Sequence, residues 1–426
     1  MICCRMTVIV LFGFGVWSLG EAPVDAEKKA ADDLFTQGYF KEAQERYETL
    51  SQSSPDNAEI LHRLGSIRFF EGEFQKAIPY FRKVADLDPS KKKPMLAYTA
   101  CACYLQKDYS NALKALKETG PVNLLNIEQV AYLAEHPPYS IDSPVDRTVV
   151  PFNKAALLPV IPIEVNSRKI FVLVDTGAVQ LIIDSEHAKE NGIKPIAQQT
   201  VQGAAGGKEA PVSFAVVEAV TLGEIKVRDV PVMLAETRRF SKDFGVEING
   251  ILGTELLMQF LPTLDYPNGE LILRIRNEQN KAAIANTKAK VRIPFIIDGI
   301  HAMYAQCRIN GKSPVLMYFD SGLADTHGAS LVLTGAALAD LGIAKPTEFE
   351  EGEGLGGAVR SRYVDIDKVS VGNLIRTGQK ATYQQGVEGT LLTYAGYKTY
   401  GIISHHFLRH YRWTIDFDNR VFLFDD

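Results

Sequence analysis

The chain has 426 residues, a formal net charge of −5 and a hydrophobic fraction of 46%. This length is too great for one ordinary domain and predicts two or three. The composition is typical of a globular protein. Because the mild negative charge comes without a basic stripe, we do not expect nucleic acid as a partner.

The N-terminal segment has the pattern of a targeting sequence. Arg5 precedes an apolar run at residues 7–17, which is too short to span a bilayer. Small residues follow, with cleavage expected after Gly20 or Ala26, so we interpret residues 1–26 as a signal peptide. A buried N-terminal helix is the alternative. We therefore expect an exported protein, periplasmic or secreted, with no stable membrane span.

Five cysteines are present, of which Cys3 and Cys4 lie in the segment that we expect to be removed. The others, Cys101, Cys103 and Cys307, do not form the dense pattern of a disulfide scaffold. A chain of this size can build its core without disulfides, so we predict that these three are buried as small hydrophobic residues.

Residues 27–118 contain a helical repeat with a period of about 34 residues. The period is carried by aromatic and small residues that recur together: Phe40, Phe74 and Tyr109, with Ala43, Ala77 and Ala112. The pattern resembles three tetratricopeptide repeats, although the consensus Trp is missing and the third unit has no counterpart of Gly38 and Gly72. Such a stack serves either as a groove for a protein partner or as a spacer packed on the next domain. The sequence leaves both open.

Residues 119–157 lose this pattern. Pro137-Pro138 and Ser143-Pro144 interrupt any long helix. We interpret the segment as a linker with a short helix near residues 126–135.

The rest of the chain is predicted to be all-β, because short alternating apolar runs are separated by Gly and Asn turns. It divides into two similar halves, residues 158–280 and 290–426. In the first, the apolar run 171–174 leads to Asp175-Thr176-Gly177-Ala178. In the second, the run 315–319 leads to Asp320-Ser321-Gly322.

Three further features follow each of these turns in the same order. A glycine-rich hairpin comes first, at residues 203–207 and 352–357. An apolar pair comes next, in the segments 250–257 and 401–408, and an Asp-led hairpin ends each half, at 265–269 and 416–420. The ordered set is far more specific than any single motif.

Together these motifs resemble the aspartic proteases, specifically the retropepsin-like lobes found in bacterial exported proteins. The resemblance covers about residues 158–426, and it implies that both lobes lie in one chain, as in pepsin-like enzymes. The expected architecture is therefore an N-terminal α-helical repeat followed by an all-β, two-lobed aspartic protease fold.

The resemblance implies that Asp175 and Asp320 are the catalytic pair. Two facing carboxylates cannot both ionise easily, so one stays protonated while the other is charged. The charged member can accept a proton from water, and the neutral member can polarise a peptide carbonyl. The pair titrates as a unit, and no metal or organic cofactor is needed.

Supporting roles follow from the same resemblance. Thr176 and Ser321 are expected to brace the two lobes through their hydroxyl groups, and Gly177 and Gly322 to permit a tight turn and close approach of the carboxylates. The glycine-rich hairpins resemble flaps that close over a peptide strand. The flap glycines are Gly203, Gly206, Gly207, Gly354, Gly356 and Gly357.

The second half departs from the pattern. Leu323 stands where a small residue is usual, Ser404 replaces a glycine, and an insertion follows Gly322. Asp325, in Asp-Thr-His-Gly, competes with Asp320, although the apolar strand leads to Asp320. We predict an aspartic endopeptidase that cleaves extended peptide or protein segments. The alternatives are a catalytically weak or inactive protease fold that binds peptides, with the repeats recruiting a partner, and a scaffold in which only the repeats matter.

Overall fold

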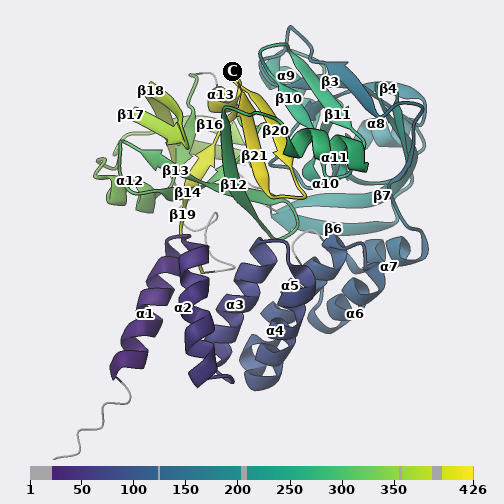
Figure 1. Cartoon of the computed structure of the whole chain (residues 1–426). Coiled ribbons are helices and arrows are strands. Elements are labelled where there is room, and N and C mark those ends of the chain that lie inside the picture. Colours follow the sequence, from purple (N-terminus) through teal and green to yellow (C-terminus); the bar gives the residue numbers. More distant parts are fainter. Residues whose placement is uncertain are drawn as a thin grey trace, which may run out of the picture.

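A computed structural model describes residues 22–122, 125–202, 209–325, 327–354, 357–385 and 396–425. A block of helices packs against a β-rich part that contains both lobes (Figure 1). Most of the expected signal peptide lies outside the described residues, and residues 22–26 form the start of the first helix. No helix in the described ranges is long and apolar enough to cross a membrane.

Three antiparallel helix pairs form the repeat domain. They are α1 (Ala22–Thr36) with α2 (Phe40–Ser53), α3 (Ala58–Phe70) with α4 (Phe74–Leu87), and α5 (Lys92–Leu105) with α6 (Tyr109–Thr119); the 3₁₀ turn η1 (Pro89–Lys91) precedes α5.

The residues that carry the sequence period occupy equivalent places in the three pairs. Phe40, Phe74 and Tyr109 each begin the second helix of a pair. The recurring alanines are completely buried, which allows the helices to pack closely. The turn glycines Gly38 and Gly72 have φ angles of 81° and 80°, and Lys107 takes a positive φ of 61° in the third pair. The predicted helical repeat is confirmed.

The segment expected to be a linker is more structured than predicted. Helix α7 (Ile127–Glu135) lies where a short helix was expected, but two strands follow it. Strand β1 (Ser140–Asp142) pairs with β8 (Ile225–Ala235), and β2 (Arg147–Pro151) pairs with β11 (Glu270–Arg274). These strands are short and their partners are distant in sequence, so local patterning did not reveal them.

The first lobe is an eight-stranded sheet of order β1-β8-β5-β9-β4-β3-β7-β6. Its other strands are β3 (Val160–Val165), β4 (Arg168–Val174), β5 (Leu181–Asp184), β6 (Ala197–Gln202), β7 (Glu209–Leu222) and β9 (Gly250–Leu252). Its helices are α8 (Ser185–Glu190), α9 (Arg238–Phe244) and α10 (Thr254–Leu257).

The second lobe contributes most of a thirteen-stranded sheet of order β16-β17-β18-β15-β19-β14-β13-β12-β21-β20-β10-β11-β2. The strands are β10 (Thr263–Asp265), β12 (Val291–Asp298), β13 (Ala302–Ile309), β14 (Val315–Phe319), β15 (Leu331–Leu333), β16 (Glu350–Gly354), β17 (Gly357–Val371), β18 (Leu374–Gln384), β19 (Thr399–Ile403), β20 (Arg412–Asp416) and β21 (Val421–Asp425). The helices are α11 (Glu278–Ala285), α12 (Gly335–Leu341) and α13 (His405–Leu408).

The two lobes are joined by a shared sheet at matched positions. Strand β10 of the first lobe pairs antiparallel with β20 of the second, with Thr263 opposite Thr414. The hydroxyl oxygens of these two buried residues lie 2.7 Å apart. Equivalent residues of the two halves therefore meet each other, as a pseudo-two-fold relationship requires.

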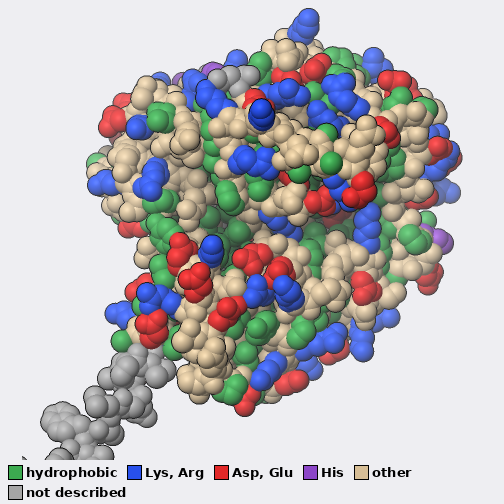
Figure 2. Space-filling model, in the orientation of Figure 1, with side chains coloured by type: hydrophobic (Ala, Val, Ile, Leu, Met, Phe, Trp, Pro, Cys, Tyr) green, Lys and Arg blue, Asp and Glu red, His purple; other side chains and the backbone are tan. Residues whose placement is uncertain are grey.

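Two main hydrophobic cores hold the molecule together. One extends through both lobes, and the other fills the helix pairs and continues into the β-rich part. Cys101, Cys103 and Cys307 form no disulfide with one another and are buried in these cores, as predicted. On the face shown in Figure 2, Lys and Arg side chains are interspersed with Asp and Glu side chains, in keeping with the mild net charge.

Candidate active site

Each lobe presents its Asp at the end of a buried strand. The backbone N–H of Asp175 donates to the Leu252 carbonyl of β9, and that of Asp320 donates to the Ile403 carbonyl of β19, both at 3.0 Å. Each carboxylate also accepts from its own turn. Asp175 Oδ1 lies 2.6 Å from the amide nitrogen of Gly177, and Asp320 Oδ1 lies 2.8 Å from that of Gly322. Both side chains are thereby fixed in matching orientations.

The structure brings the two carboxyl groups together, where they hydrogen-bond to each other. This contact depends on the absence of side chains at the two glycines. A Cβ atom at Gly322 would lie 2.2 Å from Asp175 Cγ, and one at Gly177 would lie 2.5 Å from Asp320 Oδ2. Neither glycine has a positive φ, so the glycines are needed here for space.

Thr176 and Ser321 tie the two turns together. The Thr176 amide donates to Ser321 Oγ, and the Ser321 amide donates to Thr176 Oγ1, both at 3.0 Å. Each hydroxyl then donates across the lobes at 2.9 Å, from Thr176 to the Phe319 carbonyl and from Ser321 to the Val174 carbonyl. Both residues are completely buried. The four bonds hold each turn against the backbone of the opposite lobe.

The surroundings of the pair favour protonated carboxyl groups. Burial among protein atoms is the largest cause, and it raises the pKa of both Asp175 and Asp320. The negative charge of Asp175 raises the pKa of Asp320 further. The two carboxyl groups can therefore share one proton over a range of pH. In this state one group is a general acid and the other a general base.

Asp325 lies in a different environment from Asp320. Its Oδ1 accepts from the backbone amides of His327 and Ala329 at 2.9 and 3.1 Å, and its Oδ2 accepts from Thr382 Oγ1 at 3.0 Å. These bonds close the loop that the sequence insertion creates. Asp325 therefore stabilises the inserted loop, and Asp320 is the residue that faces Asp175.

Ser404 stands where the first lobe has Gly253, and the inserted loop makes room for its side chain. In the first lobe, a Cβ at Gly253 would lie 2.4 Å from the Gln180 carbonyl oxygen, so no side chain fits. In the second, Ser404 is buried, and its hydroxyl donates to the Ala329 carbonyl at 2.7 Å. The loop follows another path here and leaves room for the hydroxymethyl group.

The two glycine-rich segments connect antiparallel strand pairs, β6 with β7 and β16 with β17. Gly354 and Gly357 lie opposite each other at the end of the second pair. The remaining flap candidates, Gly203, Gly206, Gly207 and Gly356, lie outside the described residues.

Two side chains next to the turns were missed by sequence reasoning. The Tyr318 hydroxyl donates to the Thr176 carbonyl at 3.0 Å, and the His301 ring hydrogen-bonds to the backbone of Gly177. Burial lowers the pKa of His301 to about 4, so its ring is neutral near pH 7. Tyr318 is part of an apolar strand and was interpreted only as a strand residue, although its position two residues before Asp320 places it near the turn. Nothing in the sequence indicated that His301 lies there.

Comparison with known proteins agrees with this geometry. The family model described as aspartyl protease matches residues 161–256 and 305–403, one segment in each lobe. Each half of the β-rich part is therefore similar to the aspartyl protease family. A tetratricopeptide repeat model matches residues 58–91, which form the second of the three helix pairs, α3 and α4, and the turn η1.

Among solved structures, the aspartyl protease lobes are similar to a retropepsin-like aspartic protease from Rickettsia conorii. The two share 18% sequence identity over 32% of this chain and 94% of that one, with a TM-score of 0.23. At this TM-score the match adds nothing to the family assignment. No curated protein matches the chain significantly.

Proposed function

We propose that the protein is an aspartic peptidase in which Asp175 and Asp320 hydrolyse peptide bonds. The observation that carries the proposal is the hydrogen-bonded pair of buried carboxyl groups, one from each lobe, held by the crossed bonds of Thr176 and Ser321. Paired carboxyl groups with raised pKa values are a suitable acid–base pair at acidic to neutral pH.

The reaction uses water as the nucleophile. The ionised carboxylate accepts a proton from water as the water oxygen bonds to the peptide carbonyl carbon, and the neutral carboxyl group protonates the carbonyl oxygen. The resulting tetrahedral diol collapses when the C–N bond breaks, with one proton passed to the leaving nitrogen. The products are a carboxylic acid and an amine, and the pair again holds one proton.

The substrate in this proposal is an extended peptide that lies across the two turns, between the β6–β7 and β16–β17 hairpins. A peptide strand can pair with hairpin backbone regardless of its side chains, which suits a broad range of sequences. The apolar N-terminal segment supports export as a part of the proposal, with periplasmic or secreted proteins as the substrate pool.

Incubation with a mixed peptide pool between acidic and neutral pH tests the proposal. We expect cleavage by the wild-type protein and its loss in Asp175→Asn. Asp33→Asn, which changes an exposed carboxylate in α1, is the matched control and should cleave normally. If wild type binds peptides but cleaves none at any pH, the protein is a peptide-binding relative of the proteases instead.

A further inference from the structure

The two sides of the catalytic pair are built from equivalent residues but are covered differently. One hydrophobic cluster contains Val179, Ile300, Tyr304, Tyr318 and Tyr397, and we call this the helix side. The other contains Ala324, Ala156, Val160, Leu173 and Val246, and we call it the open side.

These clusters correspond to each other residue by residue. Tyr318 and Leu173 each lie two positions before the catalytic Asp of their lobe, and Val179 and Ala324 each lie four positions after it. Counting from the turn asparagines, Asn310 and Asn166, gives the pairs Tyr304 with Val160 and Ile300 with Ala156. Counting from Gly401 and Gly250 pairs Tyr397 with Val246. The pseudo-two-fold relationship therefore places the clusters on opposite sides of the pair.

On the helix side, the repeat domain packs directly against the residues that flank the catalytic turns. Val179, just beyond the Asp175 turn, is 4% exposed. Tyr397 packs with its ring centroid 5.5 Å from that of Phe40 and 5.4 Å from that of Phe70, in α2 and α3. The Tyr397 hydroxyl donates to Asp298 at 2.9 Å, which fixes its ring in this position.

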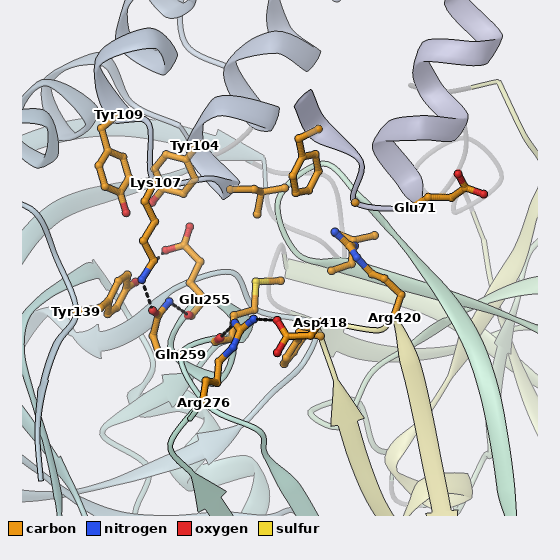
Figure 3. Close-up of a pocket in the computed structure, with 16 residues that line it drawn as sticks. Glu71, Tyr104, Lys107, Tyr109, Tyr139, Glu255, Gln259, Arg276, Asp418 and Arg420 are labelled. Atoms are coloured by element: carbon orange, nitrogen blue, oxygen red, sulfur yellow. Dashed lines mark hydrogen bonds and ion pairs between the residues drawn. The ribbon is translucent and has the colours of Figure 1, made fainter. Parts of the chain in front are cut away.

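Polar contacts also join the helices to the two lobes on the helix side. Gln180 is completely buried, and its side chain accepts from Gln129 of α7 at 3.2 Å. The backbone amide of Lys398 donates to the Thr36 carbonyl at the end of α1 at 2.6 Å. Glu255, which hydrogen-bonds to Gln180, points toward Tyr104 of the repeat domain (Figure 3). The helices thus contact both lobes around one side of the pair.

The open side is covered by the first lobe itself, and among the described residues no part of the repeat domain belongs to its cluster. Ala324 is partly exposed, whereas its counterpart Val179 is buried. Leu157, the counterpart of His301, is 38% exposed. The rings that pack on this cluster are Phe171 of β4 and Phe240 and Phe244 of the short helix α9, all in the first lobe.

We infer that the repeat domain closes one end of the substrate path, so that the peptidase cleaves near one terminus of its substrate. The inference rests on the proposed function and narrows it from an endopeptidase to a terminus-limited peptidase. An extended strand advances about 3.3 Å per residue, so residues beyond the first few on the helix side would have to pass through the packed helices. A peptide can continue only past Ala324 and Leu157. Its substrates are then chains with a free, unblocked end.

A linear peptide and its head-to-tail cyclised form, presented to the full-length protein, test this inference. We expect the linear peptide to be cut at a short, constant distance from one terminus, and the cyclic form to be cut at least about tenfold more slowly. Mass spectrometry of the products identifies the distance and the terminus. Equal rates, with cuts along the whole cyclic sequence, would overturn the inference and leave the proposed peptidase standing. If neither peptide is cut, the proposed function itself fails.

A matched pair of variants tests whether the substrate extends past Leu157 on the open side. Leu157→Asp changes an exposed leucine on the open side, and Leu87→Asp changes one that is 42% exposed at the end of α4. Because both side chains reach solvent, both variants should fold. We expect Leu157→Asp to raise KM for linear peptides about tenfold, equivalent to one lost apolar contact, and Leu87→Asp to leave KM unchanged. An unchanged KM in Leu157→Asp would contradict an exit on this side.

Discussion

The Thr176 and Ser321 amides each donate to the other residue's hydroxyl oxygen, at the same distance of 3.0 Å. Because each hydroxyl also donates to a carbonyl of the opposite lobe, neither turn can move without breaking bonds to the other. The placement of Asp175 and Asp320 is therefore a property of the lobe interface. Thr176 and Ser321, next to the carboxylates, position them through bonds between their hydroxyl groups and the backbone of the opposite lobe.

Thr176→Ala should lower both stability and activity. It removes two hydrogen bonds and leaves the buried Ser321 amide without its acceptor, which costs about 1–3 kcal/mol. Thr176→Ser keeps the hydroxyl and should stay close to wild type. Urea unfolding and peptide hydrolysis measure the two effects. If the Ala and Ser variants unfold at the same urea concentration, the crossed bonds do not stabilise the interface.

Gly322→Ala should separate the two carboxyl groups. The added methyl carbon would lie 2.2 Å from Asp175 Cγ, so one of the turns must shift. Gly177→Ala should behave in the same way, because its methyl carbon would lie 2.5 Å from Asp320 Oδ2. We expect near-complete loss of peptide hydrolysis in both, with the circular dichroism spectrum retained. Full activity in either variant would contradict the close approach of the pair.

The pH dependence of hydrolysis should be bell-shaped. At low pH both carboxyl groups are protonated and no base remains; at high pH both are ionised and no acid remains. Burial raises the pKa of both, so the alkaline limb should lie above the ordinary Asp value of about 3.9. Initial rates measured across pH give the two limbs. A rate that continued to rise into alkaline solution would argue against a shared proton.

Glu255→Gln should change how stability depends on pH. Burial raises the pKa of Glu255 to about 7, although hydrogen bonds from Tyr104, Tyr139 and Gln180 oppose the rise. Glu255 lines a cavity of about 280 Å³ between the repeat domain and the lobes (Figure 3). In the unfolded chain the group ionises near its ordinary pKa of 4.5, so the folded state loses stability as pH rises from there through about 7.

The loss amounts to about 3 kcal/mol above pH 7. Since Gln cannot ionise, the variant should gain stability over wild type between pH 5 and pH 8. Thermal unfolding at the two pH values measures the gain, and Glu186→Gln, at an exposed site in the first lobe, is the control. The same difference between variant and wild type at both pH values would show that Glu255 does not titrate in this range.

The duplicated features of the β-rich part were predictable because each is local. An apolar strand leading into Asp175 or Asp320, followed by a hydroxyl residue and a glycine, can be read from adjacent residues. The first-lobe sheet and the shared sheet could not be completed in this way, since β1 and β2 pair with strands far along the chain. The helical period likewise identified the repeat domain from spacing alone.

The contacts between domains had no such signature. Phe40 fits the helical period, and nothing in its position indicates that its ring meets Tyr397. Gln129 and Gln180 look like surface residues, and their burial results from the docking of α7 on the loop after Asp175. The sequence left open whether the repeats form a binding groove or a spacer. The structure shows them packed on the lobes beside Asp175 and Asp320.

Asp320→Asn compared with Asp325→Asn is the most direct test of the catalytic pair. The substitutions are chemically identical and only five positions apart, but Asp320 meets Asp175 while Asp325 bonds to Thr382 and the inserted loop. We predict that Asp320→Asn abolishes cleavage of the peptide pool and that Asp325→Asn retains it. Cleavage that survives in Asp320→Asn, or that is lost only in Asp325→Asn, would contradict the assignment of Asp175 and Asp320 as the pair that activates water.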